Sequence, residues 1–90
     1  MQTLEEWKQK LTEEHFGELW AHTDPPGHFY EEHEHPVDTV YVVLTGSMTV
    51  WFEGSEHVVK EGERLNIPKG ISHTAKIGAQ KCTFLIGARM

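Results

Sequence analysis

A period of two dominates the chain from residue 18 onward, where apolar and polar residues alternate in short runs. Alternation of this kind places successive side chains on opposite faces of a β-strand. Turn-forming residues interrupt the runs, as in Asp-Pro-Pro-Gly at 24–27 and Pro-Lys-Gly at 68–70. The pattern predicts eight strands, at 18–23, 29–35, 39–45, 48–52, 57–60, 64–67, 73–77 and 81–86. Eight short strands at near-regular spacing are typical of an all-β sandwich or barrel, which leaves few strand edges open.

The first 17 residues follow a helical period instead. Leu4, Trp7 and Leu11 recur at the spacing of one helix face, and Thr3 with Glu6 forms a capping-box pattern. We therefore expect an amphipathic α-helix that ends near residue 16 and packs against the barrel or against a neighbouring copy. Because 90 residues suffice for one domain, we expect a single domain with an N-terminal helix in residues 1–17 and a barrel in residues 18–90.

The charge balance and the cysteine content limit the partners and the compartment. Eight Lys and Arg against fourteen Asp and Glu give a net charge of −6, which argues against nucleic acid or an anionic membrane as a partner. No apolar run approaches the roughly 18 residues of a membrane span, and the first residues do not resemble a signal peptide. The single Cys82 excludes an internal disulfide. We expect a cytoplasmic protein.

Histidine is the compositional exception, with seven residues in ninety. His33 and His35 lie two positions apart, so on a strand both imidazoles would face the same side. If that side is the barrel interior, the two rings offer nitrogen ligands to a metal ion. In a chain this rich in histidine, however, a His-x-His pair also arises readily by chance.

Two longer patterns surround the histidines. Gly27, His33, His35 and Gly46 form Gly-x5-His-x-His-x10-Gly, and residues 62–73 form Gly-x5-Pro-x-Gly-x2-His, ending at His73. Over roughly residues 25–78 the chain resembles the cupin superfamily, whose members fold as a double-stranded β-helix, or jelly-roll barrel. The resemblance implies that His33, His35 and His73 hold one divalent transition metal. The alternative is a trio of polar core histidines bonded to one another and to water.

The chain departs from the family pattern at two positions. Thr39 stands where the first motif usually has a glutamate ligand, and Ile77 stands where the second motif commonly has asparagine. Glu31 shares the parity of His33 and could replace the missing carboxylate. Asp38 could do so only if a bulge reverses its side. The metal itself stays open, because imidazole suits iron, zinc, nickel and copper alike, and manganese is a further candidate.

Three neutral imidazoles would leave a divalent ion with its full +2 charge, which favours an anionic and chelating ligand. The ligand set resembles the three-histidine sites of thiol dioxygenases and of the β-diketone-cleaving dioxygenase, which use ferrous iron. The resemblance therefore implies a metal-binding cupin that holds a small anionic molecule and oxidises it with O₂. Two alternatives remain: a binding or sensing module without turnover, and a metal-dependent isomerase of a sugar or keto acid, with Glu31 or Asp38 as base. The sequence does not decide whether the chain is an enzyme, and it identifies no catalytic residue.

Strand parity predicts the lining of the barrel. On the face of the ligands lie Thr39, Tyr41, Phe52 and Ile77, our candidates for a small, mostly apolar pocket. Trp51 falls on the opposite face of its strand and, with Trp7 and Trp20, predicts an apolar outer patch. Such patches often mark subunit contacts, and small cupins are commonly homodimers, so we expect a homodimer.

Overall fold

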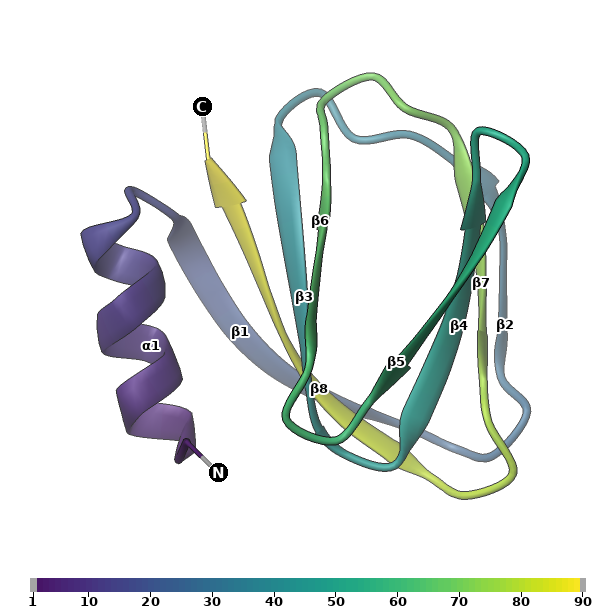
Figure 1. Cartoon of the computed structure of the whole chain (residues 1–90), viewed down its shortest axis with the longest axis horizontal. Helices are drawn as coiled ribbons and strands as arrows, with labels where there is room; N and C mark the ends of the chain where they lie inside the picture. Colours follow the sequence, from purple (N-terminus) through teal and green to yellow (C-terminus); the bar gives the residue numbers. More distant parts are fainter. Residues whose placement is uncertain (1, 90) are drawn as a thin grey trace.

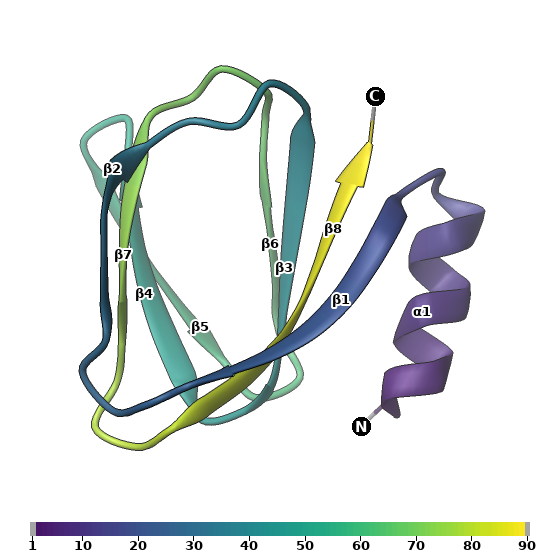
Figure 2. The ribbon, with the colours of Figure 1, turned by 180° about the vertical axis from the view of Figure 1, so that it is seen from behind.

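The structure, a computed structural model of the chain, describes residues 2–89. It confirms the all-β fold with one N-terminal helix, and each of the eight predicted strands is present (Figures 1 and 2). The elements are α1 (Leu4–Glu13), β1 (Gly17–Asp24), β2 (Phe29–His33), β3 (Asp38–Thr45), β4 (Ser47–Phe52), β5 (Ser55–Lys60), β6 (Arg64–Ile67), β7 (His73–Ile77) and β8 (Cys82–Arg89).

Two antiparallel four-stranded sheets face each other and form the jelly-roll barrel. One sheet has the order β1-β8-β3-β6 and the other has the order β2-β7-β4-β5. Consecutive strands, apart from the pair β4 and β5, therefore lie in different sheets, and their loops run along the rims of the barrel (Figure 1). The core between the sheets contains Tyr41, Val43, Val50, Ile77 and Phe84 among others.

Strand β3 is buried on both faces, which explains its nearly continuous apolar sequence. Tyr41 and Val43 point into the core between the sheets, while Val40 and Val42 join a second apolar cluster on the outside of the same sheet. Helix α1 covers this outer face with Trp7 and Leu11, and Leu85 of β8 completes the cluster. The predicted helix therefore packs on its own barrel.

The helix begins as predicted and ends earlier than predicted. The Glu6 backbone N–H donates to Thr3 Oγ1 at 3.1 Å, and the Thr3 N–H donates to Glu6 Oε1 at 2.9 Å, which completes the capping box. At the other end His15 adopts a positive φ of 71°, and the Phe16 N–H donates to the Leu11 carbonyl at 2.9 Å. This is a Schellman-type stop with an apolar contact between Leu11 and Phe16.

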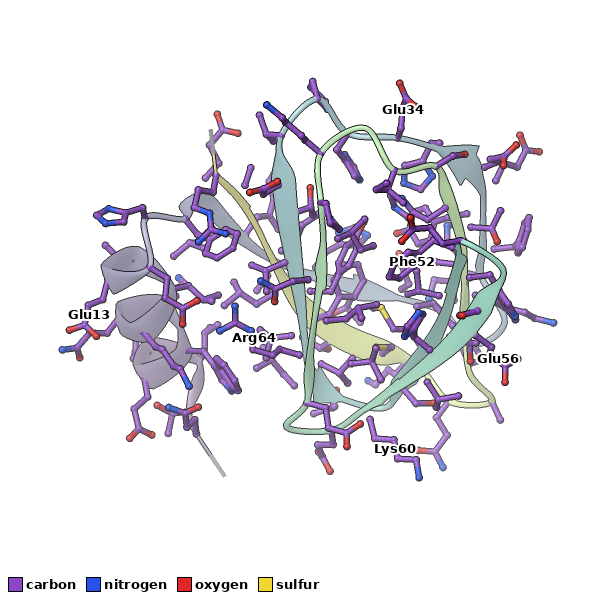
Figure 3. The ribbon with its side chains drawn as sticks, turned by 45° about the horizontal axis from the view of Figure 1, so that its top comes forward. Glu13, Glu34, Phe52, Glu56, Lys60 and Arg64 are labelled. Atoms are coloured by element: carbon purple, nitrogen blue, oxygen red, sulfur yellow. The ribbon has the colours of Figure 1, made fainter. Side chains whose placement is uncertain are left out.

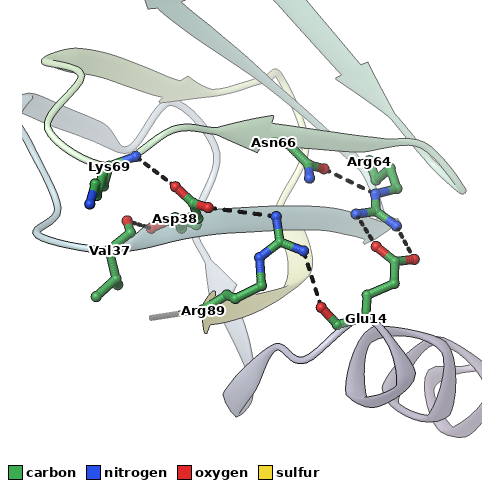
Figure 4. Close-up of polar contacts among 8 residues, drawn as sticks. Glu14, Val37, Asp38, Arg64, Asn66, Lys69 and Arg89 are labelled. Carbon is green, nitrogen blue, oxygen red and sulfur yellow. Dashed lines mark hydrogen bonds and ion pairs between the residues drawn. The ribbon is translucent and has the colours of Figure 1, made fainter.

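Polar contacts fix the end of α1 to the rim of the sheet (Figure 4). The Arg64 guanidinium donates to both carboxylate oxygens of Glu14, at 2.9 and 3.0 Å, and Arg89 donates to the Glu14 carbonyl at 3.1 Å. Arg64 lowers the pKa of the Glu14 carboxyl, chiefly through this hydrogen bond. The helix is thus attached by a polar clamp as well as by its apolar face.

The predicted tryptophan patch is wrong in one member. Trp7, a residue of α1, is buried between the helix and the sheet on which it packs, whereas Trp20 is largely exposed.

Across residues 2–89, no helix combines the length and the apolar character that crossing a membrane would require.

Replacing Leu11 with Ala tests the packing of the helix. Leu11 is fully buried against the sheet, so the substitution should lower the free energy of unfolding by about 2–4 kcal/mol through lost burial and a residual cavity. Urea unfolding followed by tryptophan fluorescence measures the change. The control Gln9→Ala removes an exposed side chain of the same helix and should change stability by less than about 0.5 kcal/mol. Equal effects of the two substitutions would contradict the packing.

Candidate metal centre

Three histidines from separate parts of the chain meet at one end of the barrel. His33 closes β2, His35 lies just beyond it, and His73 opens β7. One ring nitrogen from each residue lies within 4.8 Å of the other two. The ring centroids of His33 and His73 are 4.2 Å apart, and those of His35 and His73 are 5.2 Å apart. The structure thus brings together the three residues that the sequence patterns single out.

Strand pairing places His33 against His73. Strand β7 lies between β2 and β4, so His73 is opposite His33 on one side and opposite Phe52 on the other. Residues directly opposite on antiparallel strands have neighbouring side chains on the same face. The second motif therefore delivers its histidine beside the first motif's pair, although 40 residues separate them in sequence.

His35 reaches the cluster from a loop, whereas the sequence predicts a strand through residue 35. The strand ends at His33, and Pro36, which cannot donate to a ladder, follows His35. The Gly70 N–H donates to the His35 carbonyl at 2.9 Å. Gly70 has a φ of +76°, a conformation that glycine adopts without strain. The turn of the second motif therefore holds the second histidine of the first motif.

Local hydrogen bonds set the ring orientation of two ligands. Nδ1 of His33 lies 2.7 Å from the Glu31 carbonyl oxygen, and Nδ1 of His73 lies 3.1 Å from the Ile71 carbonyl oxygen. Because a carbonyl oxygen only accepts, each Nδ1 carries a proton, so in the neutral form of either ring the free lone pair is on Nε2. Metal-binding histidines commonly show this arrangement.

The donor set fits a metal ion. Nε2 of His73 is buried and has no hydrogen-bond partner among the described residues, a costly state for a polar atom unless something binds it. An ion about 2.1 Å from each nitrogen requires donors about 3–4 Å apart, and the three ring nitrogens lie within 4.8 Å of one another. Within residues 2–89, no carboxylate joins this group of ligands.

Burial keeps the cluster in the form that binds metal. Desolvation lowers the pKa of His35, and the neighbouring His33 and His73 lower it further. Desolvation also lowers the pKa of His73, although its hydrogen bond to the Ile71 carbonyl partly opposes the shift. Both rings are therefore neutral at pH 7, with lone pairs available to an ion.

A cavity of about 130 Å³ begins at the histidines and extends into the barrel. His33, His35, Tyr41 and Ile77 contribute to its lining, and Met48, Ala75, Phe84 and Ile86 make the rest of the wall mostly apolar. An apolar cavity of about 150 Å³ holds a benzene molecule. The space beside the histidines therefore suits an organic molecule of a few carbon atoms.

Of the four residues predicted to line a pocket, two do so. Tyr41 and Ile77 line the cavity, and the Tyr41 hydroxyl lies 3.3 Å from Nε2 of His35. Burial raises the pKa of Tyr41 to about 12, so its hydroxyl is protonated at neutral pH. Phe52 instead packs beside the core and stacks on His57 at a centroid distance of 4.4 Å. Thr39 is buried, but its hydroxyl donates to the Val37 carbonyl.

Neither carboxylate suggested by the sequence reaches the histidines. Asp38 accepts a hydrogen bond from the Lys69 N–H at 3.0 Å and pairs with Arg89 at 3.6 Å (Figure 4). Glu31 is exposed, although it shares the parity of His33. Glu34, between the two ligands in sequence, projects outward from the rim (Figure 3).

A bulge in β2 explains the position of Glu31 and reveals a residue that sequence parity misses. Tyr30 pairs with Ala75 and His33 pairs with His73, so the register shifts by one residue between them. Such a bulge reverses the alternation of side chains. Tyr30 therefore lines the cavity together with His33, and Glu31 lies outside. The parity of a single strand gives no signal of this reversal.

The sequence profile of the Cupin_2 family, described as a cupin domain, matches residues 20–86. This chain is a cupin. The match includes all three histidines and every strand that carries them. No curated protein matches the chain significantly.

Solved structures of other proteins share the fold. A cupin-2 domain protein from Shewanella frigidimarina is 23% identical with a TM-score of 0.69, over 80% of this chain and 69% of that one. A Streptococcus pyogenes protein of unknown function is 19% identical with a TM-score of 0.71, over 80% of this chain and 63% of that one. The DMSP lyase DddQ from Ruegeria pomeroyi is 23% identical with a TM-score of 0.73, over 80% of this chain and 37% of the lyase. This cupin therefore spans less than two thirds of the length of the last two proteins.

The lowered pKa values of His35 and His73 predict that the metal-free cupin loses stability as the pH falls. In the unfolded chain these two histidines take up protons near pH 6.5. In the folded chain they take up protons only at a lower pH. Stability present above about pH 6.5 is therefore lost as the pH falls through the folded-state pKa. Urea unfolding with a chelator should give a lower midpoint at about pH 5.5 than at about pH 7.5.

Two variants test the assignment of this pH effect. In the double variant H35Q/H73Q, the difference between the two midpoints should shrink. In His28→Gln, which removes an exposed histidine outside the cluster, the difference should persist. If the urea midpoint falls between about pH 7.5 and about pH 5.5 by the same amount in the double variant as in the parent, the assignment is contradicted.

Proposed function

We propose that this cupin binds one divalent transition metal through His33, His35 and His73, and a small anionic organic molecule beside it. The observation that carries the proposal is the buried Nε2 of His73, which has no hydrogen-bond partner among the described residues and lies in a group of three imidazoles beside a cavity. A divalent ion held there would supply positive charge and open coordination positions for the ligand.

The lining residues favour a small ligand with one anionic end. The three ligands carry no negative charge, so an ion bound by them would keep its +2 charge and attract an anion. Tyr41, protonated and adjacent to His35, can donate a hydrogen bond to a ligand atom near the ion. Met48 and Phe84 give the cavity apolar walls that exclude water from the rest of the ligand.

Oxidation of this ligand by O₂ is the reaction that we favour if the cupin is an enzyme. The three-histidine set and the apolar wall support oxidation over isomerisation, because neither of them supplies the general base that isomerisation needs. The isomerase alternative needs a general base within reach of the ligand, and Glu31 and Asp38 both lie away from the cavity. A binding or sensing module without turnover fits the same site and is the second candidate.

Metal content tests the proposed site directly. Purified untagged cupin should contain about one equivalent of a transition metal by elemental analysis. His73→Ala should reduce the content to near zero, because it removes the buried ligand. His28→Gln, outside the cluster, should retain the metal. Equal metal content in the parent and in His73→Ala, or no metal after reconstitution of the parent, would contradict the proposal.

Removal of O₂ and replacement of the bound metal distinguish the three candidate functions. An oxygenase should lose turnover without O₂ and after replacement of iron by zinc. An isomerase should keep turnover in both experiments. A binding module should show a ligand-dependent rise in melting temperature and form no product from the same ligand.

We also propose that two copies associate in the cytoplasm through the outer face of the β2-β7-β4-β5 sheet. Phe29 on the edge strand β2 and Val58 on the opposite edge strand β5 are about half exposed, and Trp51 on β4 donates its indole N–H to Glu56 at 3.2 Å. A free Cys82, buried in the core, agrees with a reducing compartment.

Light scattering after gel filtration should give twice the mass of one chain, and Val58→Lys should halve the measured mass. A parent that elutes as one chain would contradict the dimer.

A further inference from the structure

A second polar cluster, which the proposed metal site does not use, lies against the same cavity. Its centre is Asp24, the last residue of β1 and the one Asp or Glu side chain that is buried among residues 2–89. His22 Nε2 lies 2.8 Å from Asp24 Oδ1, and the Tyr30 hydroxyl donates to Asp24 Oδ2. The two oxygens of this carboxylate are thus each bound by one side chain.

The chemistry of the cluster fixes the direction of both hydrogen bonds. An ionised carboxylate only accepts, so Nε2 of His22 carries its proton and the Tyr30 hydroxyl is the donor. Burial raises the pKa of Tyr30 well above its usual range, and the hydrogen bond to Asp24 raises it further. The hydroxyl of Tyr30 therefore stays protonated, and its only proton is committed to Asp24.

Any hydrogen bond that the Tyr30 oxygen makes toward the cavity is consequently one that it accepts. Tyr30 is among the residues that line the cavity, and a lone pair that remains on its oxygen can only accept a hydrogen bond. The negative carboxylate behind the hydroxyl makes that oxygen a stronger acceptor, because hydrogen bonds in series polarise one another. A ligand group that is itself an acceptor would be repelled at this point.

The acceptor lies away from the histidines along the barrel. β1 ends and β2 begins at the lower end of the barrel in Figure 1, and β2 reaches the three histidines only at its upper end. Three residues of strand separate the Cα atoms of Tyr30 and His33 by roughly 10 Å, and their ring centroids are 6.4 Å apart. One small molecule can therefore contact both groups.

We infer that the ligand of this cupin carries a hydrogen-bond donor, a hydroxyl or an ammonium group, which the Tyr30 oxygen accepts while the anionic end binds at the three histidines. Asp24 and His22 are positioning residues, which hold the Tyr30 proton away from the cavity. This inference rests on the proposed function and narrows its substrate class to short hydroxy or amino acids of a size that about 130 Å³ admits.

Matched pairs of carboxylates test the inference on the metal-loaded protein. Glycolate and propanoate, 3-hydroxypropanoate and butanoate, and 4-hydroxybutanoate and pentanoate are pairs of equal size that differ by a hydroxyl in place of a methyl group. Isothermal titration calorimetry should show the hydroxy acid binding about five- to tenfold tighter than its partner in at least one pair. The corresponding ω-amino acid, whose ammonium only donates, should also bind tighter than the methyl acid.

Two variants assign the preference to the cluster. Tyr30→Phe keeps the ring and removes the acceptor, so the hydroxy and methyl acids should then bind equally. Asp24→Asn keeps the volume but can donate to the Tyr30 oxygen, which competes with the ligand and should weaken the preference. Phe52→Leu, at a residue that does not line the cavity, should retain the parent's preference.

The outcomes distinguish this inference from the proposed function. If His73→Ala holds as much metal as the parent, or if the parent holds none after reconstitution, the proposed metal site is wrong. If the protein holds its metal but binds both members of every pair equally, or binds none of the acids, the inference about Tyr30 is overturned and the metal site stands. A preference that persists unchanged in Tyr30→Phe would also overturn it.

Discussion

The central position of β7 between β2 and β4 is the constraint on which the site depends. Antiparallel pairing on both sides sets His73 directly opposite His33 and Phe52. A slip of one residue in either ladder would turn the His73 side chain to the outer face of the sheet. The backbone hydrogen bond between Gly70 and His35 brings the third histidine from the neighbouring loop. The candidate metal centre is thus specified by main-chain pairing.

The sheet that contains β3 is packed on both of its faces, against the barrel core on one side and against α1 on the other. Strand β3 sends Tyr41 and Val43 inward and Val40 and Val42 outward, where α1 covers them. The Tyr41 hydroxyl beside His35 is therefore carried by a strand with packing on both faces. A side chain in such surroundings has little freedom to move, which favours a preformed site over one that assembles around its ligand.

Most of the fold and the three candidate ligands could be predicted from the sequence, because both depend on short-range patterns. The strands follow from alternation and turn residues, and the helix start follows from Thr3 and Glu6. The predictions that failed depend on local irregularities. The bulge in β2 brings Tyr30 inside and leaves Glu31 outside, and the loop after His33 carries His35, which the alternation pattern places on a strand. Trp7 is buried because the helix faces its own sheet.

The sequence by itself determined the class of fold, the position of the helix and the identity of the three histidines, since periodicity and motif spacing are properties of the chain alone. Only the tertiary structure decided which carboxylate lies near the cavity. Asp38 turns to Lys69 and Arg89 at the rim, and Asp24, which no motif contains, is buried against Tyr30. The physical reason is that a buried charge persists only where donors meet it, and Tyr30, one of the two partners of Asp24, comes from a strand of the opposite sheet, whose place only the fold decides.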